Sequence, residues 1–156
     1  MSLKNFSVFL LFPLIVGCTT SKLQQQTSLA PSVKELRSFP AVTCASDSST
    51  RKAVRTRHIV IEVSTDAPED KVRAAYAKAV EVRSALTQGE SFVALENRFS
   101  AGAISRGLNG GNLDYFAKGT MVPEFEKMAF CLPLNETSPV FSTGFGFHIL
   151  EVTGVK

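Results

Sequence analysis

The two histidines of the chain, His58 and His148, are the side chains best suited to acid–base or hydrogen-bonding chemistry near neutral pH. Both lie in stretches of alternating apolar residues that predict β-strands, His58 in the first strand and His148 in the last. If these two strands are neighbours, the imidazoles meet on one side of the sheet. A histidine on a strand is more often a satisfied structural residue than a catalyst, so that role stays open for both.

Two other kinds of chemistry lack support in the sequence. Metal binding needs further ligands at suitable spacing, and none stands beside the histidines, so we expect no metal and no cofactor. No serine lies in a nucleophile-elbow context, and Cys44 and Cys131 lack a local activation signature. These two cysteines could pair as a disulfide in an oxidising compartment, or Cys131 could be a small buried apolar residue.

A bulky apolar cluster stands at the start of a helix-like run, in the stretch GTMVPEFEKMAF. Met121, Val122 and Phe125 surround Pro123 at a place where polar capping residues are usual. The cluster either fills the core or lines a pocket for an apolar ligand. The residue types alone slightly favour core packing and leave both interpretations open.

The elements that must position these residues follow from the hydrophobic pattern. RHIVIEV, from Arg57, alternates as a strand, and two amphipathic helices follow it, the first ending at Gly89 and the second capped by Ser91. LDYF predicts a short strand, Pro123 to Cys131 a short helix, and SPVFST and FGFHILEV a hairpin through Gly144. The order β-α-α-β-α-β-β predicts an α+β fold, in which helices pack on a four-stranded antiparallel sheet.

The chain divides into three predicted parts. Residues 1–17 form a signal-peptide-like segment, residues 18–55 a flexible tether rich in Ser, Thr and Gln with one short helical turn near Val33, and residues 56–156 the folded domain. The formal charge of +3 is uneven, because residues 19–55 carry six basic and two acidic side chains. A nucleic-acid-binding protein would carry its basic surface on the folded domain, so we expect no nucleic-acid partner.

The N-terminal stretch ends in LIVGC, Leu14 to Cys18, which resembles the lipobox of bacterial lipoproteins. The apolar run from Phe6 to Val16 is too short to span a bilayer comfortably and fits a secretory signal peptide. The resemblance implies that Cys18 is acylated, and that Thr19, which is not an aspartate, directs the protein to the outer membrane. A plain signal peptide or an uncleaved anchor with a chance cysteine stays open.

Residues 57–153 resemble the parvulin family of peptidyl-prolyl cis/trans isomerases, in the style of the bacterial secreted foldases. The segments that carry the resemblance are, in order, RHIVIEV, GESFVALENRFS, GGNLDYFAKGTMVPEFEKMAF, SPVFST and FGFHILEV. Each segment alone is a weak signal, whereas the combination covers nearly the whole predicted domain and is specific. The resemblance implies the parvulin fold and, as activity, isomerisation of the bond before proline in secreted or envelope proteins that are folding.

The resemblance also implies roles for particular residues. In parvulins the positions that match Met121, Phe125 and Leu113 line a slot for the proline ring. The pair that matches His58 and His148 forms a hydrogen-bonded network beneath that slot. Residues around Thr143 to Phe145 match a further wall of the slot. We therefore expect His58, His148 and Thr143 to be catalytic. The expected substrate-binding residues are Leu113, Phe116, Met121, Phe125 and Phe145.

The sequence departs from the family pattern in ways that bear on activity. Many parvulins have a cysteine or an aspartate soon after the second helix, where this chain has Ala101 and Gly102, and their GDLG segment is GNLD here. The acidic stretch EVSTDAPEDK stands where phosphate-directed parvulins have a Lys/Arg cluster, so we expect no preference for phosphorylated Ser/Thr-Pro. An active isomerase is the first hypothesis. A non-catalytic peptide-binding chaperone module and a purely structural outer-membrane lipoprotein are the alternatives.

The first hypothesis also defines the partners and the place of action. The expected partners are proline-containing unfolded polypeptides and, through the lipid on Cys18, the membrane. We expect a monomer at the periplasmic face of the bacterial envelope.

Overall fold

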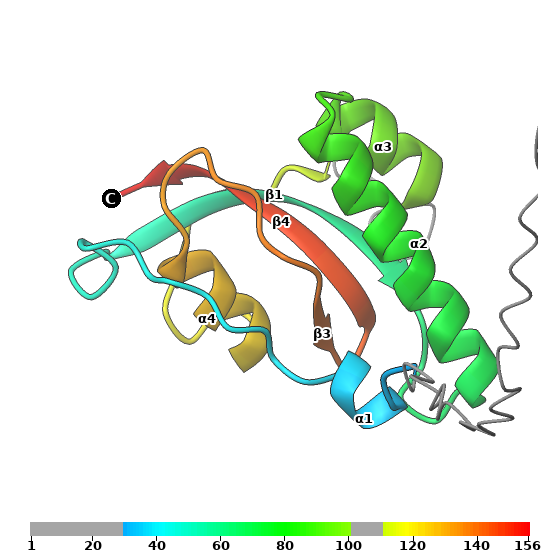
Figure 1. The fold of residues 1–156 in the computed structure, drawn as a ribbon. Coiled ribbons are helices and arrows are strands. Elements are labelled where there is room, and N and C mark those ends of the chain that lie inside the picture. The colour runs from blue at the N-terminus through cyan, green and yellow to red at the C-terminus, as the bar shows by residue number, and fades with distance from the viewer. Residues whose placement is uncertain (1–29, 101–110) are drawn as a thin grey trace, which may run out of the picture.

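The computed structural model describes residues 30–100 and 111–156. It confirms the predicted α+β fold, a four-stranded antiparallel sheet in the order β2-β1-β4-β3 with helices packed on it (Figure 1). Cys18, Ala101 and Gly102 lie outside the described residues. The elements are α1 (Val33–Leu36), β1 (Ala53–Glu62), α2 (Glu69–Thr87), α3 (Phe92–Phe99), β2 (Phe116–Ala117), α4 (Pro123–Cys131), β3 (Phe141–Thr143) and β4 (Gly146–Val155).

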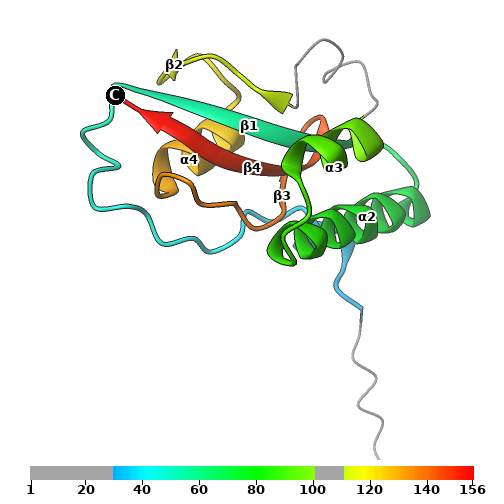
Figure 2. The ribbon, with the colours of Figure 1, turned by 90° about the horizontal axis from the view of Figure 1, so that it is seen from above.

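The first and last long strands, β1 and β4, run side by side through the centre of the molecule (Figure 2). They pair antiparallel from Val54 opposite Val155 to Glu62 opposite Gly146, with one register shift after Arg55. The short strands β2 and β3 flank them at the two edges. The strands that carry His58 and His148 are therefore neighbours, as the hypothesis that the two imidazoles meet requires.

The two faces of the sheet bury two different apolar clusters, because side chains alternate along each strand. On one face, Ile59 and Ile61 of β1 and Phe147 and Ile149 of β4 pack against α2 and α3. On the other face, α4 covers the opposite set of strand residues, with its own Met128, Ala129 and Phe130 fully or almost fully buried. The histidines belong to the α4 face, because both imidazoles contact the Phe125 ring of α4. In the described residues no helix is both long and apolar enough to cross a membrane.

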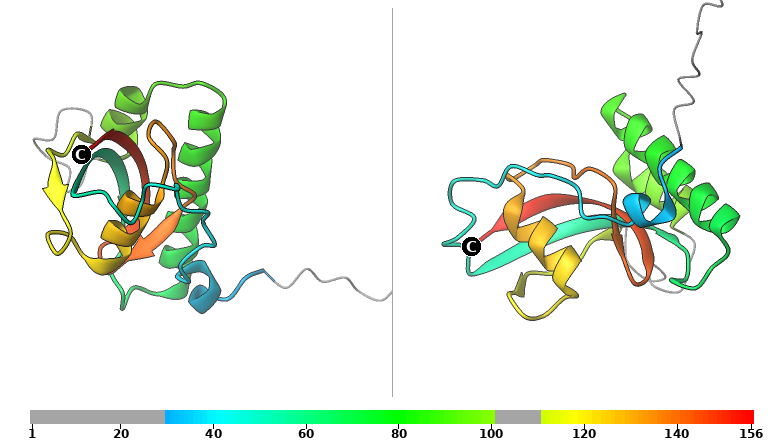
Figure 3. Two further views of the ribbon diagram at one scale, coloured as in Figure 1. Left: turned by 90° about the vertical axis from the view of Figure 1, so that its left-hand side faces the viewer. Right: turned by 60° about the horizontal axis from the view of Figure 1, so that its bottom comes forward.

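The segment that precedes β1, residues 37–52, lies along α4 (Figure 3) and is called the strap below. Its Phe39 ring packs against Phe141 of β3, with 6.3 Å between ring centroids, and Cys44 forms a disulfide with Cys131 at the end of α4. The backbone N–H of Ala45 also donates to the carbonyl of Cys131, at 2.7 Å. The short helical turn predicted near Val33 is present as α1. The rest of the predicted tether differs, because the strap is attached to α4 and β1 begins at Ala53, before the predicted domain boundary.

A buried arginine completes the attachment of the strap. The Arg51 guanidinium donates from Nη1 to the carbonyl oxygens of Phe130 and Leu132, at 3.2 and 2.5 Å, and from Nη2 to Asp47. The last carbonyls of a helix have no partner within the helix and carry partial negative charge, so a cation is favourable there. Arg51 therefore stabilises the C-terminal end of α4.

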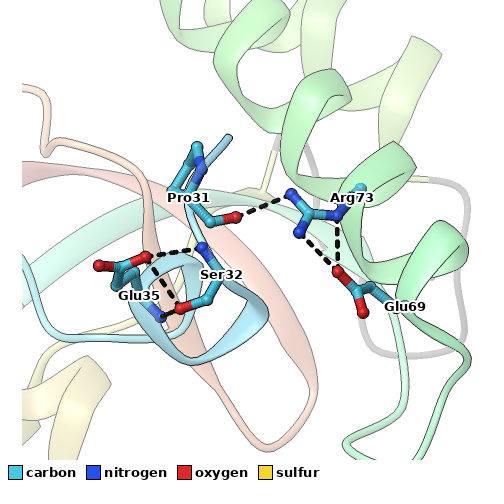
Figure 4. A network of polar contacts seen from close by, with 5 residues as sticks. All are labelled: Pro31, Ser32, Glu35, Glu69 and Arg73. Carbon is cyan, nitrogen blue, oxygen red and sulfur yellow. Dashed lines mark hydrogen bonds and ion pairs between the residues drawn. The ribbon is translucent and has the colours of Figure 1, made fainter. Parts of the chain in front are cut away.

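Helix α1 attaches the chain to α2 by polar contacts that Figure 4 shows. Ser32 and Glu35 form a capping box, which satisfies backbone donors at the start of α1. Arg73 of α2 donates from Nη1 to the carbonyl of Pro31 at 2.7 Å, and its guanidinium pairs with Glu69 one turn earlier. Leu36 then inserts its side chain into the cluster between the sheet and α2.

Candidate functional site

A pocket of about 270 Å³ lies on the α4 face of the sheet. Its lining comes from both central strands, from α4 and from three connecting segments, so that residues far apart in the sequence form one cavity. Its lining residues are His58, Leu113, Thr120, Met121, Val122, Phe125, Phe145 and His148.

The two histidines are brought together by the register of β1 and β4. Val60 lies opposite His148 and His58 opposite Leu150, so the imidazoles are diagonal neighbours on one face. Their ring centroids are 6.0 Å apart. Both side chains are buried, with His58 5% and His148 3% exposed. The sequence hypothesis that the imidazoles meet on one side of the sheet agrees with this geometry.

The hydrogen bonds of the histidines are fewer than the family resemblance implies. Nε2 of His148 lies 2.8 Å from the hydroxyl of Thr143, and that hydroxyl also accepts a hydrogen bond from the backbone N–H of Phe145. Within the described part of the chain, no residue is hydrogen-bonded to either ring nitrogen of His58. The imidazoles are therefore not bonded to each other, and the expected network is represented here by the Thr143–His148 contact.

Burial keeps both imidazoles uncharged near neutral pH. Removal from water lowers the pKa of His58 to about 4. The pKa of His148 is lowered to about 3, mainly by burial and further by the neighbouring His58, because two imidazolium charges at this distance would repel each other. The base of the pocket therefore holds two neutral rings near pH 7. Both nitrogens of His58 and Nδ1 of His148 are buried and bonded to no described residue, whereas Nε2 of His148 contacts Thr143.

Phe125 forms the floor of the pocket between the two histidines. Its ring meets His58 edge-on with 5.4 Å between centroids and His148 edge-on with 5.9 Å. The side chain is 4% exposed and belongs to the apolar cluster beneath α4. Phe141 stacks on His148 from the other side of that ring, at 5.4 Å. Two aromatic rings and the Thr143 hydroxyl thus fix the orientation of His148.

The outer part of the pocket is apolar and open to solvent. Phe145 is 51% exposed at the turn between β3 and β4, Val122 is exposed, and Met121 is partly buried. Apolar side chains that remain exposed around a cavity commonly mark a binding site. Met121 and Phe125 both line the pocket, and both also pack in the apolar cluster beneath α4, Phe125 as a buried member and Met121 at its edge.

The remaining wall, Leu113, is held by the segment that leads from the glycine-rich loop. Its N–H donates to the carbonyl of Thr56 at 2.8 Å, next to His58 on β1. Gly111 has a φ of +72°, and a Cβ at this position would meet the carbonyl oxygen of His58 at 2.0 Å. Only glycine allows this close approach of two backbones.

Two predicted site residues lie elsewhere, and two pocket residues were not among the site residues that the resemblance implied. Phe116 pairs with Val54 across β2 and β1 and is buried against Phe125 and Phe130, so it supports the pocket from the core. Thr143 lies behind His148 and does not line the cavity. Thr120 and Val122 line the pocket although the resemblance assigned them no role. Their place between Gly119 and Phe125, in the same apolar stretch as Met121, was the available signal.

The described residues hold no group of three or more His, Cys, Asp or Glu side chains that could bind a metal ion. What the site offers instead is an apolar recess with neutral hydrogen-bonding groups at its base. Such a recess, on a four-stranded antiparallel sheet with packed helices, has the architecture that the resemblance to parvulins predicts.

The comparisons with known proteins agree with this architecture. Residues 24–156 match the model of the PPIC-type peptidyl-prolyl isomerase domain, and the chain belongs to that family. It is similar to the foldase protein PrsA of Caldanaerobacter subterraneus, with 35% identity over 67% of this chain and 30% of the relative. It is also similar to the chaperone SurA of Pseudomonas syringae, with 36% identity over 67% of this chain and 23% of the relative. The chain thus spans less than a third of the length of these relatives.

Solved structures show the same domain. The peptidyl-prolyl isomerase PrsA from Bacillus anthracis superimposes with a TM-score of 0.55 at 30% identity, over 70% of this chain and 46% of that one. The parvulin NmPin of Nitrosopumilus maritimus superimposes with a TM-score of 0.51 at 30% identity, over 66% of this chain and 97% of that one. The second comparison shows that a nearly complete parvulin corresponds to the domain described here.

Proposed function

We propose that this protein is a peptidyl-prolyl cis/trans isomerase that assists the folding of polypeptides outside the cytoplasm. The observation that carries the proposal is the apolar pocket with Phe125 and two neutral imidazoles at its base. Membership of the PPIC-type family supports the activity, and relatives named as a foldase and a chaperone support the use of that activity on unfolded chains.

The reaction needs no nucleophile, because no covalent bond is broken. Resonance keeps the amide before proline planar, with a barrier of about 18–20 kcal/mol to rotation. An enzyme accelerates the rotation when it binds the twisted amide more tightly than either planar form. Met121, Phe125 and Leu113 can hold the proline ring by apolar contacts while the rest of the peptide turns. Removal of water from the amide favours the twisted form, because that form is less polar.

Neutral imidazoles can take part in this reaction through hydrogen bonds. A twisted amide has a pyramidal nitrogen that can accept a hydrogen bond, and donors aimed at this atom stabilise the transition state. The nitrogens of His58 and Nδ1 of His148, which no described residue engages, are the candidates for such a donor once a peptide is bound. The Thr143 hydroxyl is a positioning group, because it contacts Nε2 of His148 and does not line the pocket.

The pocket favours prolines with apolar neighbours. Phe145 and Val122 form an exposed apolar rim that can cover the side chain next to the proline. No lining residue carries a positive charge while the histidines are neutral, so a phosphate next to the proline would be desolvated without a cation. We therefore propose unphosphorylated, proline-containing unfolded chains as substrates.

We further propose that residues 1–17 are a signal peptide, that Cys18 carries lipid in the outer membrane, and that the residues between Cys18 and the folded unit act as a tether. The LIVGC stretch supports this arrangement. The domain then acts as a monomer in the periplasm. Mass measurement of the mature N-terminus tests the proposal, since an unlipidated chain that starts elsewhere would contradict it.

The isomerase proposal is tested by exchange NMR on a peptide with an apolar residue before proline, without a coupled protease. We expect Met121→Ala to lower kcat/KM about tenfold, because apolar contact worth about 1.4 kcal/mol is lost. Leu134→Ala is the matched control, since Leu134 is an exposed apolar residue outside the pocket. A wild-type protein that binds unfolded chains but leaves the exchange rate unchanged would support a peptide-holding module instead.

A further inference from the structure

The outer wall of the pocket is a short loop between β2 and α4. Thr120, Met121 and Val122 of this loop supply three of the eight lining residues. Lys118 and Gly119 precede them and form the turn that leaves β2. The pocket can hold a proline ring only if this loop stays in place, because its three residues form part of the lining together with Phe145 and the histidines.

Both ends of the loop are hydrogen-bonded to one residue, Glu126 in the first turn of α4. The Glu126 carboxylate accepts a hydrogen bond from the backbone N–H of Gly119, seven residues earlier. The backbone N–H of Glu126 donates to the carbonyl of Val122 at 3.0 Å. Between residues that the structure describes, no other backbone hydrogen bond involves Gly119 to Val122.

The geometry of the turn makes the carboxylate contact possible. Gly119 has a φ of +85°, a backbone conformation that glycine adopts without strain. A carboxylate that accepts from a backbone N–H forms a charge-assisted bond, which is roughly twice as strong as a neutral one. The bond closes the loop into a ring with the first turn of α4 and fixes Met121 within it.

We infer that Glu126 is a positioning residue that holds the outer wall of the pocket against α4, an inference that rests on the proposed function. Glu126 does not line the pocket, so it acts through Met121 and its neighbours. Glu124 provides an internal comparison. It lies in the same helical turn and carries the same charge, but no contact to the loop is found for its side chain in the described structure.

The experiment compares Glu126→Ala, Glu126→Gln and Glu124→Ala with the wild type. Titration of each with a short proline-containing peptide, followed by NMR, gives the dissociation constant and the Gly119 amide proton resonance together. We expect Glu126→Ala to shift that resonance upfield and to raise the dissociation constant about tenfold. Glu126→Gln should restore most of both, since an amide oxygen also accepts. Glu124→Ala should resemble the wild type, although it removes the same charge from the helix N-terminus.

The outcomes separate this inference from the proposed function. A wild type that binds the peptide but does not catalyse exchange overturns the isomerase proposal and leaves the role of Glu126 supported by the titration. An unchanged Gly119 resonance and peptide affinity in Glu126→Ala would overturn the inference. Equal losses in the three variants would also overturn it, because they would indicate helix electrostatics. If Glu126→Ala does not fold, Glu126→Asp, whose side chain is one carbon shorter, gives the same two measurements.

Discussion

The disulfide between Cys44 and Cys131 gives the sharpest stability prediction. The bond joins the strap to the end of α4 and closes a loop with a sequence separation of 87 residues. Replacing both cysteines by serine opens this loop. Arg51 and Ala45 hydrogen-bond to carbonyls at the end of α4 without using the disulfide, so we expect these bonds to remain in the folded variant. The substitution therefore acts mainly by raising the conformational entropy of the unfolded chain.

The size of the effect follows from the entropy of the unfolded loop. For a loop of this length the chain-entropy relation gives about 4.6 kcal/mol of stabilisation at 25 °C. Native disulfides in small domains deliver about 2–5 kcal/mol in practice, so we expect a loss of about 3–4 kcal/mol. With the usual unfolding entropy per residue, that loss lowers Tm by roughly 10–15 °C.

The measurement is urea and thermal unfolding of the wild type and of the Cys44→Ser/Cys131→Ser variant. Mass spectrometry after thiol alkylation establishes that the bond is present in the wild type. A reducing agent should lower the stability of the wild type to that of the variant and leave the variant unchanged. This second comparison controls for any effect of the serine side chains.

A small result would refute the reasoning. If the bond is present and its removal costs less than about 1 kcal/mol, the strap does not unfold together with the domain. The loop would then be closed in the reduced chain by residual structure, or the strap would detach without affecting the core. The first outcome would contradict the entropy argument, and the second would separate the strap from the cooperative unit that contains the pocket.

Three further predictions concern the pocket. Lowering the pH from 7 to 5 should reduce the free energy of unfolding by about 2 kcal/mol for each buried histidine. The folded pKa values of His58 and His148, about 4 and about 3, lie below the value in the unfolded chain. The unfolded chain therefore binds protons first as the pH falls, which favours unfolding. Urea titrations at both pH values measure this, and a flat stability would contradict it. Gly111→Ala should lower the free energy of unfolding by more than about 2 kcal/mol, because the added Cβ would overlap the His58 carbonyl. Gly89→Ala is the control and should cost about 1 kcal/mol, because Gly89 also has a positive φ but has open space around it. Phe145→Ala should weaken peptide binding several-fold with Tm unchanged, because the side chain is half exposed; calorimetry that finds equal affinity would exclude Phe145 from the binding rim.

Elements with a strong local signal were predictable from the sequence. The helix from Pro123 to Cys131 has the predicted bounds, because proline fixes its first turn and the apolar residues recur at helical spacing. The strands that carry the histidines were predictable from alternation. That His58 and His148 share a face depends on the pairing of β1 with β4, which the sequence could state only as a condition.

The residues that the sequence misplaced depend on contacts between distant segments. Phe116 is an aromatic residue of the kind that lines apolar pockets. Its strand is only two residues long, and the pairing of Phe116 with Val54 decides which way its side chain points. The strap has a polar composition that suggests a disordered tether. Its order comes from a few apolar residues, such as Phe39 and Val42, and from the contacts of Arg51 with carbonyls of α4. The sequence pattern within the strap does not predict contacts with residues so far along the chain.

The strap belongs to the same physical unit as the pocket, and it lies within residues 24–156, which match the family model. Phe39 packs on Phe141, and Phe141 stacks on His148, so one chain of rings leads from the strap to the base of the pocket. At the opposite end of α4, Arg51 holds the last carbonyls of the helix that carries Phe125. The buried imidazoles lower stability in acid, and the strap adds stability to the cluster that buries them. A domain cut at the start of β1 would keep every pocket residue and the direct contacts of the His148 ring. It would lose the strap contacts that support Phe141 and the C-terminal end of α4.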